Sequence, residues 1–199
     1  MIDEKLLERF LRLDTSLVSD ALEDLQIPGG LLGIRSIVPG MRLCGEAFTV
    51  RYVPLGLEEP QAGTYLPKVQ KGQVVMIENA GRTDHAIWGD IMTRAGKQKE
   101  LGGVVIDGAC RDIEAVRETL FPVYAKGVSM VSGKRHVKAD QIQVPISVSG
   151  MRVCPGDLIF GDETGVIAIP QAKLLEVLEK AEEIQKAEEA LIHSLIGRD

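Results

Sequence analysis

The chain has 199 residues, of which 45% are hydrophobic and 26% are charged, and its formal net charge is −6. This composition is that of an ordinary soluble globular protein. It excludes a chain disordered throughout, a collagen-like repeat and a membrane-spanning helix, which needs roughly 20 consecutive apolar residues. The acidic balance and an aromatic content of 4% also argue against nucleic-acid binding, which relies on basic surfaces and stacking rings.

The N-terminal third predicts two helices followed by β structure. The opening MIDEKLLERFLRLD is acidic and amphipathic and has no apolar signal-peptide core, so we expect a cytoplasmic protein. Its leucines recur at helical spacing, and a second helix begins where Thr15 or Ser16 can cap it and ends at Pro28. Residues 38–42 then lead into a strand expected at 45–53.

The middle third predicts an alternation of strands and helices. We expect, in order, a short helix at 61–69, a buried strand at 73–77, a helix at 87–99, an apolar strand at 103–106, a turn at Asp107-Gly108, a helix at 112–120 and a strand at 122–124. A strand that is apolar throughout is typical of a parallel sheet buried on both faces. The pattern therefore favours a βαβ unit with a parallel strand pair.

The last third predicts strands near 142–148, 158–160 and 166–169, and one long helix at 171–196. The apolar residues of this helix form a continuous stripe, which must cover either the chain's own sheet or a neighbouring subunit. No linker or internal repeat interrupts the chain. We therefore expect a single α/β domain over residues 1–199, with an interface helix at 170–196.

Two groups of residues that often carry function are expected to be inert here. Three cysteines, at 44, 110 and 154, are far apart and form no C-x-x-C pair, which argues against a disulfide framework and a thiolate zinc site. Cys110 is expected to be a small buried hydrophobic residue rather than a nucleophile. The basic cluster at 134–138 is expected to be a solvated loop or hairpin.

A first candidate site is the start of the helix expected at 87–99, where Gly89, Asp90, Ile91 and Met92 follow one another. Backbone N–H groups at a helix start bind carboxylate or phosphate, and Gly89 would let an anion approach closely. Asp90 can equally be a helix N-cap with no further role. His85 and Trp88 flank this turn and can either line a pocket or pack.

A second candidate site follows the apolar strand at 103–106, where a glycine-containing loop leads to Arg111 and Asp112. Ligands of α/β sheets gather outside the carboxyl ends of strands. Arg111 offers a planar fork for a carboxylate, and Asp112 offers a hard oxygen ligand suited to Mg²⁺ or Mn²⁺. The alternative is that Asp112 caps the following helix and Arg111 pairs on the surface.

Together the two segments form the motif D-x20-R-D, from Asp90 to Arg111-Asp112. With it, the sequence resembles the metal-dependent class II pyruvate aldolases of the 4-hydroxy-4-methyl-2-oxoglutarate aldolase and oxaloacetate decarboxylase type, which share their fold with the regulator of ribonuclease E activity A. Further marks of the resemblance, which covers nearly the whole chain, are SDAL at 19–22, GEAFTV at 45–50, GVVIDG at 103–108, VCPGD at 153–157 and GDETGV at 161–166. The ribonuclease regulators lack the second aspartate of D-x20-R-D, which is present here. Cys110 and Glu100 depart from the family pattern without removing a functional group.

The resemblance implies an α/β/β/α sandwich like a swivelling domain, with a long C-terminal helix, assembled as a homotrimer or homohexamer. It implies that Asp112 ligates a divalent metal, Mg²⁺ or Mn²⁺, that Asp90 holds the metal through water, and that Arg111 with the backbone amides of residues 89–92 binds a 2-oxo acid. Glu188 lies on the apolar stripe of the last helix, where it is either at the rim beside a buried Ala187 or an acid supplied in trans to a neighbour's metal site.

The implied reaction is retro-aldol cleavage of a 4-hydroxy-2-oxo acid that releases pyruvate, with oxaloacetate decarboxylation as a second activity. The alternative is a non-catalytic regulatory binding protein like the ribonuclease regulators, whose acidic surface masks a basic partner. A methyltransferase is disfavoured because no glycine-rich strand-to-helix loop of the adenosylmethionine-binding type is present. No nucleic-acid or membrane partner is expected.

Overall fold

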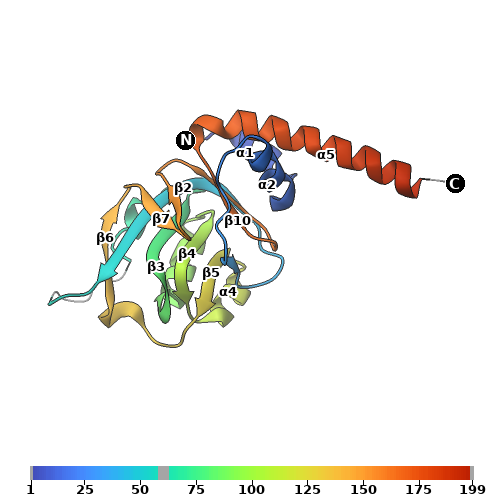
Figure 1. Ribbon diagram of the computed structural model, residues 1–199. Coiled ribbons are helices and arrows are strands. Elements are labelled where there is room, and N and C mark those ends of the chain that lie inside the picture. Colours follow the sequence, from blue (N-terminus) through green and yellow to red (C-terminus); the bar gives the residue numbers. More distant parts are fainter. Residues whose placement is uncertain (1, 58–62, 198–199) are drawn as a thin grey trace.

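The computed structural model describes residues 2–57 and 63–197 and has a mixed α/β fold (Figure 1). Its main sheet has the order β1-β5-β4-β3-β2-β9-β10, and β6 also pairs with β2. The strands are β1 (Arg35–Ser36), β2 (Leu43–Pro54), β3 (Val74–Trp88), β4 (Gly103–Cys110), β5 (Val123–Val128), β6 (Val137–Ile142), β9 (Leu158–Gly161) and β10 (Val166–Ile169), with β7 (Ile146–Val148) and β8 (Met151–Val153) forming a separate hairpin. The helices are α1 (Glu4–Phe10), α2 (Thr15–Asp24), α3 (Asp90–Gln98), α4 (Ile113–Thr119) and α5 (Leu174–Ile196), and single 3₁₀ turns lie at Leu66–Lys68, Gly133–Arg135 and Gln171–Lys173.

The centre of the sheet is parallel. Strands β2, β3, β4 and β5 pair in parallel, and α3 and α4 connect β3 to β4 and β4 to β5. Every residue of β4 is buried, as expected for a parallel strand covered on both faces. The predicted βαβ unit is therefore confirmed.

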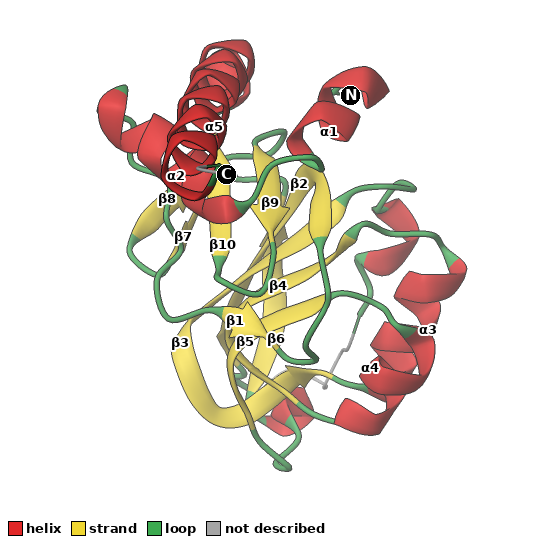
Figure 2. Cartoon of the chain, turned by 90° about the vertical axis from the view of Figure 1, so that its right-hand side faces the viewer, coloured by secondary structure: helices red, strands yellow, loops and turns green. Residues whose placement is uncertain are grey.

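The layers follow from three apolar cores. One core joins α3 and α4 to one face of β2–β5, and Figure 2 shows these two helices side by side on that face. A second core lies between the opposite face and the layer formed by β9, β10 and the β7–β8 hairpin. A third core joins the outer face of β9 and β10 to α1, α2 and α5. The result is the predicted α/β/β/α sandwich, with the long C-terminal helix on its last layer.

Two predicted boundaries in the middle of the chain are wrong. Strand β3 runs on to Trp88, so α3 begins at Asp90 rather than at 87, and β4 continues through Asp107 and Gly108, where a turn was expected. Asp107 is nearly fully buried in the strand because its carboxylate pairs with the ammonium of Lys126 on β5 at 2.6 Å. A residue pair typical of turns is thus held in a strand by a partner on the next strand.

Other helices and strands also begin or end at residues different from those predicted. Asp14, not Thr15 or Ser16, caps α2, with its carboxylate accepting from the N–H of Leu17 at 2.9 Å, and Thr15 instead donates to Asp162. Residues 38–42 lead into β2, which begins at Leu43 rather than at 45. The helix expected at 61–69 is reduced to the 3₁₀ turn at Leu66–Lys68, and its residues 61 and 62 lie outside the described residues.

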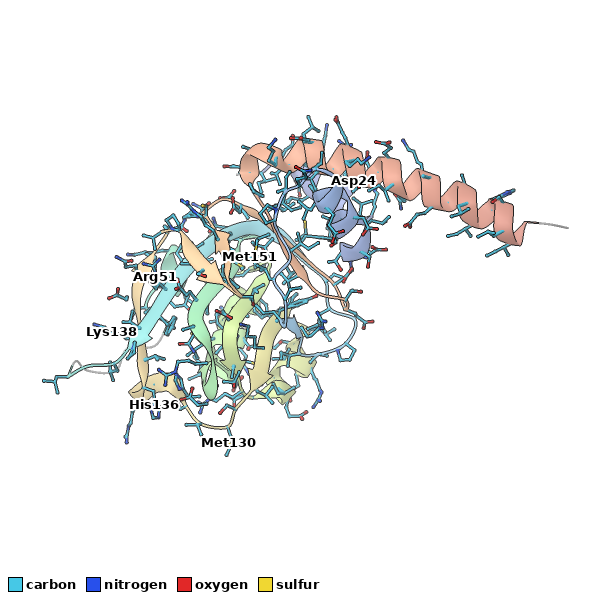
Figure 3. All side chains as sticks on the ribbon, viewed as in Figure 1. Asp24, Arg51, Met130, His136, Lys138 and Met151 are labelled. Carbon is cyan, nitrogen blue, oxygen red and sulfur yellow. The ribbon has the colours of Figure 1, made fainter. Side chains whose placement is uncertain are left out.

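Helix α5 packs on the body only through its first half. Leu174, Val177, Leu178 and Ala181 are buried, and Lys180 pairs with Asp24 of α2 at 3.1 Å. The second half projects beyond the body (Figure 1), and its side chains point outward on several sides (Figure 3). The apolar residues left exposed there are Leu191, Ile192, Leu195 and Ile196. None of the helices in the described ranges has the length and apolarity needed to cross a membrane.

Candidate functional site

A pocket of about 350 Å³ lies where β3 ends, α3 begins and β4 leads into α4. It opens on the side of the sheet that α3 and α4 cover, at the carboxyl ends of the parallel strands, which is where α/β sheets usually bind ligands. Its lining is Tyr52, Ala86, Ile87, Trp88, Gly89, Asp90, Ile91, Met92, Arg111, Asp112, Ser132, Gly133, Lys134 and Val137. The pocket therefore unites the two segments of the D-x20-R-D motif.

Gly89 is the N-cap of α3 and allows the two segments to touch. A Cβ at this position would lie 2.6 Å from Oδ2 of Asp112 and 3.1 Å from Cγ of Arg111. The backbone of Gly89 is extended (φ −154°), a conformation open to any residue. The requirement for glycine is therefore steric, because the Asp112 carboxylate occupies the space of a side chain.

Asp112 stands at the N-cap position of α4 but does not cap that helix. Its backbone is left-handed (φ 57°, ψ 50°), and its side chain makes no capping hydrogen bond. Oδ2 instead accepts from the backbone N–H of Asp90 at 2.9 Å and lies 3.4 Å from Nε of Arg111. The side chain of Asp112 therefore does not cap α4, because its carboxylate is turned to the start of α3.

Arg111 ties the end of β4 to the end of β3. Its backbone N–H donates to the carbonyl of Trp88 at 2.9 Å, and its side chain passes against Gly89. The guanidinium is 40% exposed and lines the pocket. It is thus placed to contact an anion that enters the pocket, and it also makes a half-exposed ion pair with Asp112, as the alternative expected.

Asp90 is the first residue of α3 and is not its cap, because Gly89 takes that position. Its carboxylate oxygen Oδ1 accepts from Nε of Arg94, one turn further along α3. Nη2 of the same arginine donates to Oε2 of Glu118 on α4 at 2.8 Å. Asp90 is therefore half exposed at the pocket rim with a cation already beside it.

The two residues flanking the Gly89 turn have different roles. Trp88 both lines the pocket and packs, since it is buried, stacks on Phe121 and donates from Nε1 to Thr93 at 3.0 Å. His85 is 1% exposed, is absent from the pocket lining and stacks on His136 at a centroid distance of 5.2 Å. For His85 the packing alternative is the one observed.

Cys110 is buried beneath the site, and burial raises the pKa of its thiol to about 12. A thiol that stays protonated at neutral pH is a poor nucleophile. The expectation that Cys110 is a buried hydrophobic residue is confirmed.

Sequence reasoning missed a second wall of the pocket, made by Tyr52 and the turn at 132–134. The predicted solvated loop contains Lys134, which is exposed on a 3₁₀ turn but also lines the pocket. The turn is held there by a bridge between Ser132 and Ala86 of β3. A Cβ on Gly133 would lie 2.7 Å from the carbonyl oxygen of Ala86, so the glycine is the only local signal of this close approach.

The metal-ligating candidates are only partly brought together. Asp90 and Asp112 meet in the pocket, but within the described ranges no group of three or more His, Cys, Asp or Glu residues is placed to hold a metal. Glu188 lies on the exposed second half of α5, in a hollow shared with Lys180, Glu183, Ile184, Ala187 and Leu191, and it does not line the pocket of its own chain.

The donor set nevertheless fits Mg²⁺ or Mn²⁺. These ions prefer hard oxygen ligands and are commonly held by one or two carboxylates, with waters and substrate completing the shell. Both carboxylates already lie next to a cationic group, Arg94 at Asp90 and Arg111 at Asp112, so a metal ion would share them with these arginines.

The chain is similar to known proteins over most of its length. The model of the family described as RraA-like, Aldolase/RraA, matches residues 15–168. A Halalkalibacterium halodurans protein named "Putative 4-hydroxy-4-methyl-2-oxoglutarate aldolase" is 32% identical over 186 residues, which are 92% of this chain and 84% of that protein. Protein DlpA of Legionella pneumophila is 38% identical over 189 residues, 94% of this chain, but the chain spans only 31% of that protein's length.

A solved structure agrees with the fold. Streptomyces coelicolor RraAS2, described as an unusual member of the RNase ES inhibitor RraA protein family, superposes with a TM-score of 0.86 at 26% identity, over 94% of this chain and 96% of that one. Relatives of this chain thus carry the names of aldolases as well as of RNase inhibitors.

Proposed function

Since the chain belongs to the RraA-like family, we propose that it is a lyase that cleaves 4-hydroxy-2-oxo acids such as 4-hydroxy-4-methyl-2-oxoglutarate, releases pyruvate and uses a divalent metal ion, Mg²⁺ or Mn²⁺. Decarboxylation of oxaloacetate is proposed as a second activity, because both reactions pass through the enolate of pyruvate. The names of the aldolase relatives support the reaction class.

The observation that carries the proposal is the position of the Asp112 carboxylate. A left-handed backbone at a residue other than glycine costs of order 1 kcal/mol or more. Here the strained backbone directs a carboxylate into a pocket instead of onto its own helix. A residue selected only to start α4 would use its side chain as a cap and would not need this conformation.

We propose that Asp112 is the direct metal ligand and that Asp90 holds the metal through water. A divalent cation held there would act as a Lewis acid toward the 2-oxo group of the substrate and the developing enolate. Its remaining ligands would be water, substrate and, in an assembled protein, Glu188 of a neighbouring copy.

The chain's own groups would bind and orient the substrate. Arg111 would pair with the substrate carboxylate or the enolate oxygen through its planar guanidinium. Residues at the start of α3 have no intrahelical acceptor for their N–H groups, so Ile91 and Met92 can each donate to the same carboxylate, while the N–H of Asp90 is already bonded to Asp112. A preorganised charge such as that of Arg111 contributes about 3–4 kcal/mol to transition-state stabilisation.

We further propose that the protein acts as a homotrimer or homohexamer. In a single copy of the protein, the apolar residues in the second half of α5 stay exposed to solvent. Exposed apolar patches usually mark interfaces between proteins. In such an assembly Glu188 would reach the metal site of a neighbour.

A non-catalytic regulatory role is the second candidate, and the likeness to RraAS2 favours it. A pure binding protein has no need of a strained carboxylate in a pocket, so the two candidates differ in what the pocket does. Under this alternative the protein would bind a basic partner without turning over any 2-oxo acid.

The decisive experiment is a coupled pyruvate assay on a panel of 4-hydroxy-2-oxo acids and oxaloacetate, with Mg²⁺ or Mn²⁺ and then with excess chelator. Pyruvate release that is abolished by chelation supports the proposal. Pyruvate release that the chelator leaves unchanged would show that the reaction needs no metal ion. No turnover of any substrate would leave the regulatory role.

A further inference from the structure

Arg94 lies between the two carboxylates of a small network at the pocket rim. Its Nε donates to Oδ1 of Asp90, and its Nη2 donates to Oε2 of Glu118 at 2.8 Å. Asp90 is on the first turn of α3 and Glu118 is near the end of α4, so one guanidinium joins the two helices. The hydrogen bonds to Glu118 and then to Asp90 raise the pKa of Arg94, and it is charged at any working pH.

The guanidinium of Arg94 is hydrogen-bonded to one carboxylate oxygen of Asp90. In the proposed function, Asp90 is the pocket carboxylate that holds the metal through water. A cation on Arg94 and a divalent cation in the pocket would therefore share Asp90. Like charges a few ångströms apart repel each other, and a carboxylate oxygen that accepts from Arg94 is a weaker acceptor for a metal-bound water.

We propose that Arg94 is an internal competitor of the metal ion for Asp90, and that Glu118 determines how strongly it competes. This inference rests on the proposed function, because it assumes that Asp90 and Asp112 form the metal site. When a metal ion engages Asp90, Arg94 can remain paired with Glu118 rather than be left without a partner. The pair Arg94–Glu118 thus sets the metal concentration at which the site fills.

The proposal predicts in which direction each substitution changes the affinity for the metal ion. Arg94→Gln removes the competing charge and should tighten metal binding by about three- to tenfold, as expected for one unit charge near a half-exposed site. Arg94→Lys keeps a cation one turn from Asp90 and should leave the affinity near that of the wild type. Glu118→Gln removes the alternative partner of Arg94 and a negative charge, so it should weaken metal binding by about two- to fivefold.

The experiment is a titration of each purified full-length variant with Mn²⁺, in which free Mn²⁺ is measured by electron paramagnetic resonance. Arg117→Gln is the matched control, because it makes the same change in charge on α4, but Arg117 pairs with Glu114 and not with a pocket residue. Its affinity should stay within twofold of the wild type. Asp112→Asn defines binding at the proposed site and should lose it. Circular dichroism shows that each variant is folded.

The results separate the two proposals. If Asp112→Asn abolishes Mn²⁺ binding and Arg94→Gln does not tighten it, the metal site stands and the inference about Arg94 is overturned. An Arg94→Lys variant that binds as tightly as Arg94→Gln would overturn it as well, because the charge would then not be the cause. If the wild type binds no Mn²⁺, or Asp112→Asn leaves binding unchanged, both proposals fail. Raising the ionic strength should shrink the difference between Arg94→Gln and the wild type.

Discussion

The carboxylate of Asp112 accepts a hydrogen bond from the backbone N–H of Asp90 at 2.9 Å, and this bond joins the first turns of two helices that are separated by a whole strand. It explains why the two aspartates of D-x20-R-D belong to one site. It also explains why a glycine precedes Asp90, since any Cβ there would lie 2.6 Å from the accepting oxygen.

Asp112→Gly is expected to abolish turnover while the protein stays folded. Glycine adopts the left-handed backbone of position 112 without strain, which offsets the lost hydrogen bond to Asp90, so the free energy of unfolding should fall by no more than about 1–2 kcal/mol. The lost carboxylate removes the proposed metal ligand, and kcat for pyruvate release should fall at least about a thousandfold. Thermal melting and steady-state kinetics on one preparation check both halves. Near-normal kcat would assign Asp112 to structure alone.

Gly89→Ala should lower activity far more than stability. The backbone of Gly89 suits alanine, but the new Cβ would displace the Asp112 carboxylate and the Arg111 side chain, so we expect about a 10–100-fold loss in kcat/KM. Gly96→Ala is the control, because its Cβ would lie 2.8 Å from Cζ of Phe121 and would strain the packing of α3 instead. That variant should lose thermal stability and keep its activity per folded molecule. The reverse pattern would contradict the role given to Gly89.

Asp107→Ala should destabilise the protein by about 3–5 kcal/mol, because it leaves the largely buried ammonium of Lys126 without its partner. The double variant Asp107→Ala/Lys126→Met should recover most of this loss, since no buried charge then remains. Urea unfolding of both variants gives the two free energies. A double variant no more stable than the single one would show that the pair is not what holds β4 and β5 together at this point.

Asp84 should make a small contribution to the free energy of unfolding, which is lost at acidic pH. The Arg82 guanidinium beside it, with the His85 imidazole, lowers the pKa of this carboxyl from 3.8 to about 2. The folded state therefore binds this proton more weakly than the unfolded state, so the stabilisation is present above about pH 4 and is lost as the pH falls toward 2. Asp84→Asn and Arg82→Gln should both flatten the dependence of the melting temperature on pH in this window. Because the pair is exposed, the change will be modest.

Truncation of α5 after Ile184 should leave the body folded but reduce both assembly and activity. The buried contacts of the helix end at Ala181, whereas the exposed apolar residues lie beyond the truncation. Glu188→Gln keeps the shape of the helix and removes one charge, so it should lower kcat without changing the oligomeric state. Glu189→Gln, its exposed neighbour, should change neither. Light scattering and the pyruvate assay test all three variants, and a fully active monomeric wild type would exclude an interfacial site.

The sequence by itself determined the class of fold, and its D-x20-R-D motif named three residues that line the candidate site. Periodicity predicted the helices at both ends and the alternating centre, because local spacing of apolar residues decides which face an element buries. The resemblance carried by D-x20-R-D predicted that Asp90, Arg111 and Asp112 belong to one site. In the structure they line one pocket, because two neighbouring parallel strands deliver their following residues to the same edge of a sheet. That Glu188 serves a neighbouring copy, and that residues 1–199 form a single domain, stay predictions.

Only the tertiary structure decided the rest, because the deciding partners are distant in the chain. Asp107 and Gly108 form a typical turn pair, yet they continue β4 because Lys126 of the next strand neutralises the buried carboxylate. Asp112 occupies a helix start, yet its side chain bonds to the start of another helix. Lys134 joins the pocket through the bridge between its turn and β3, and the only local sign of this bridge is Gly133. In each case a contact with a residue that is distant in the chain outweighs the local preference of the residue.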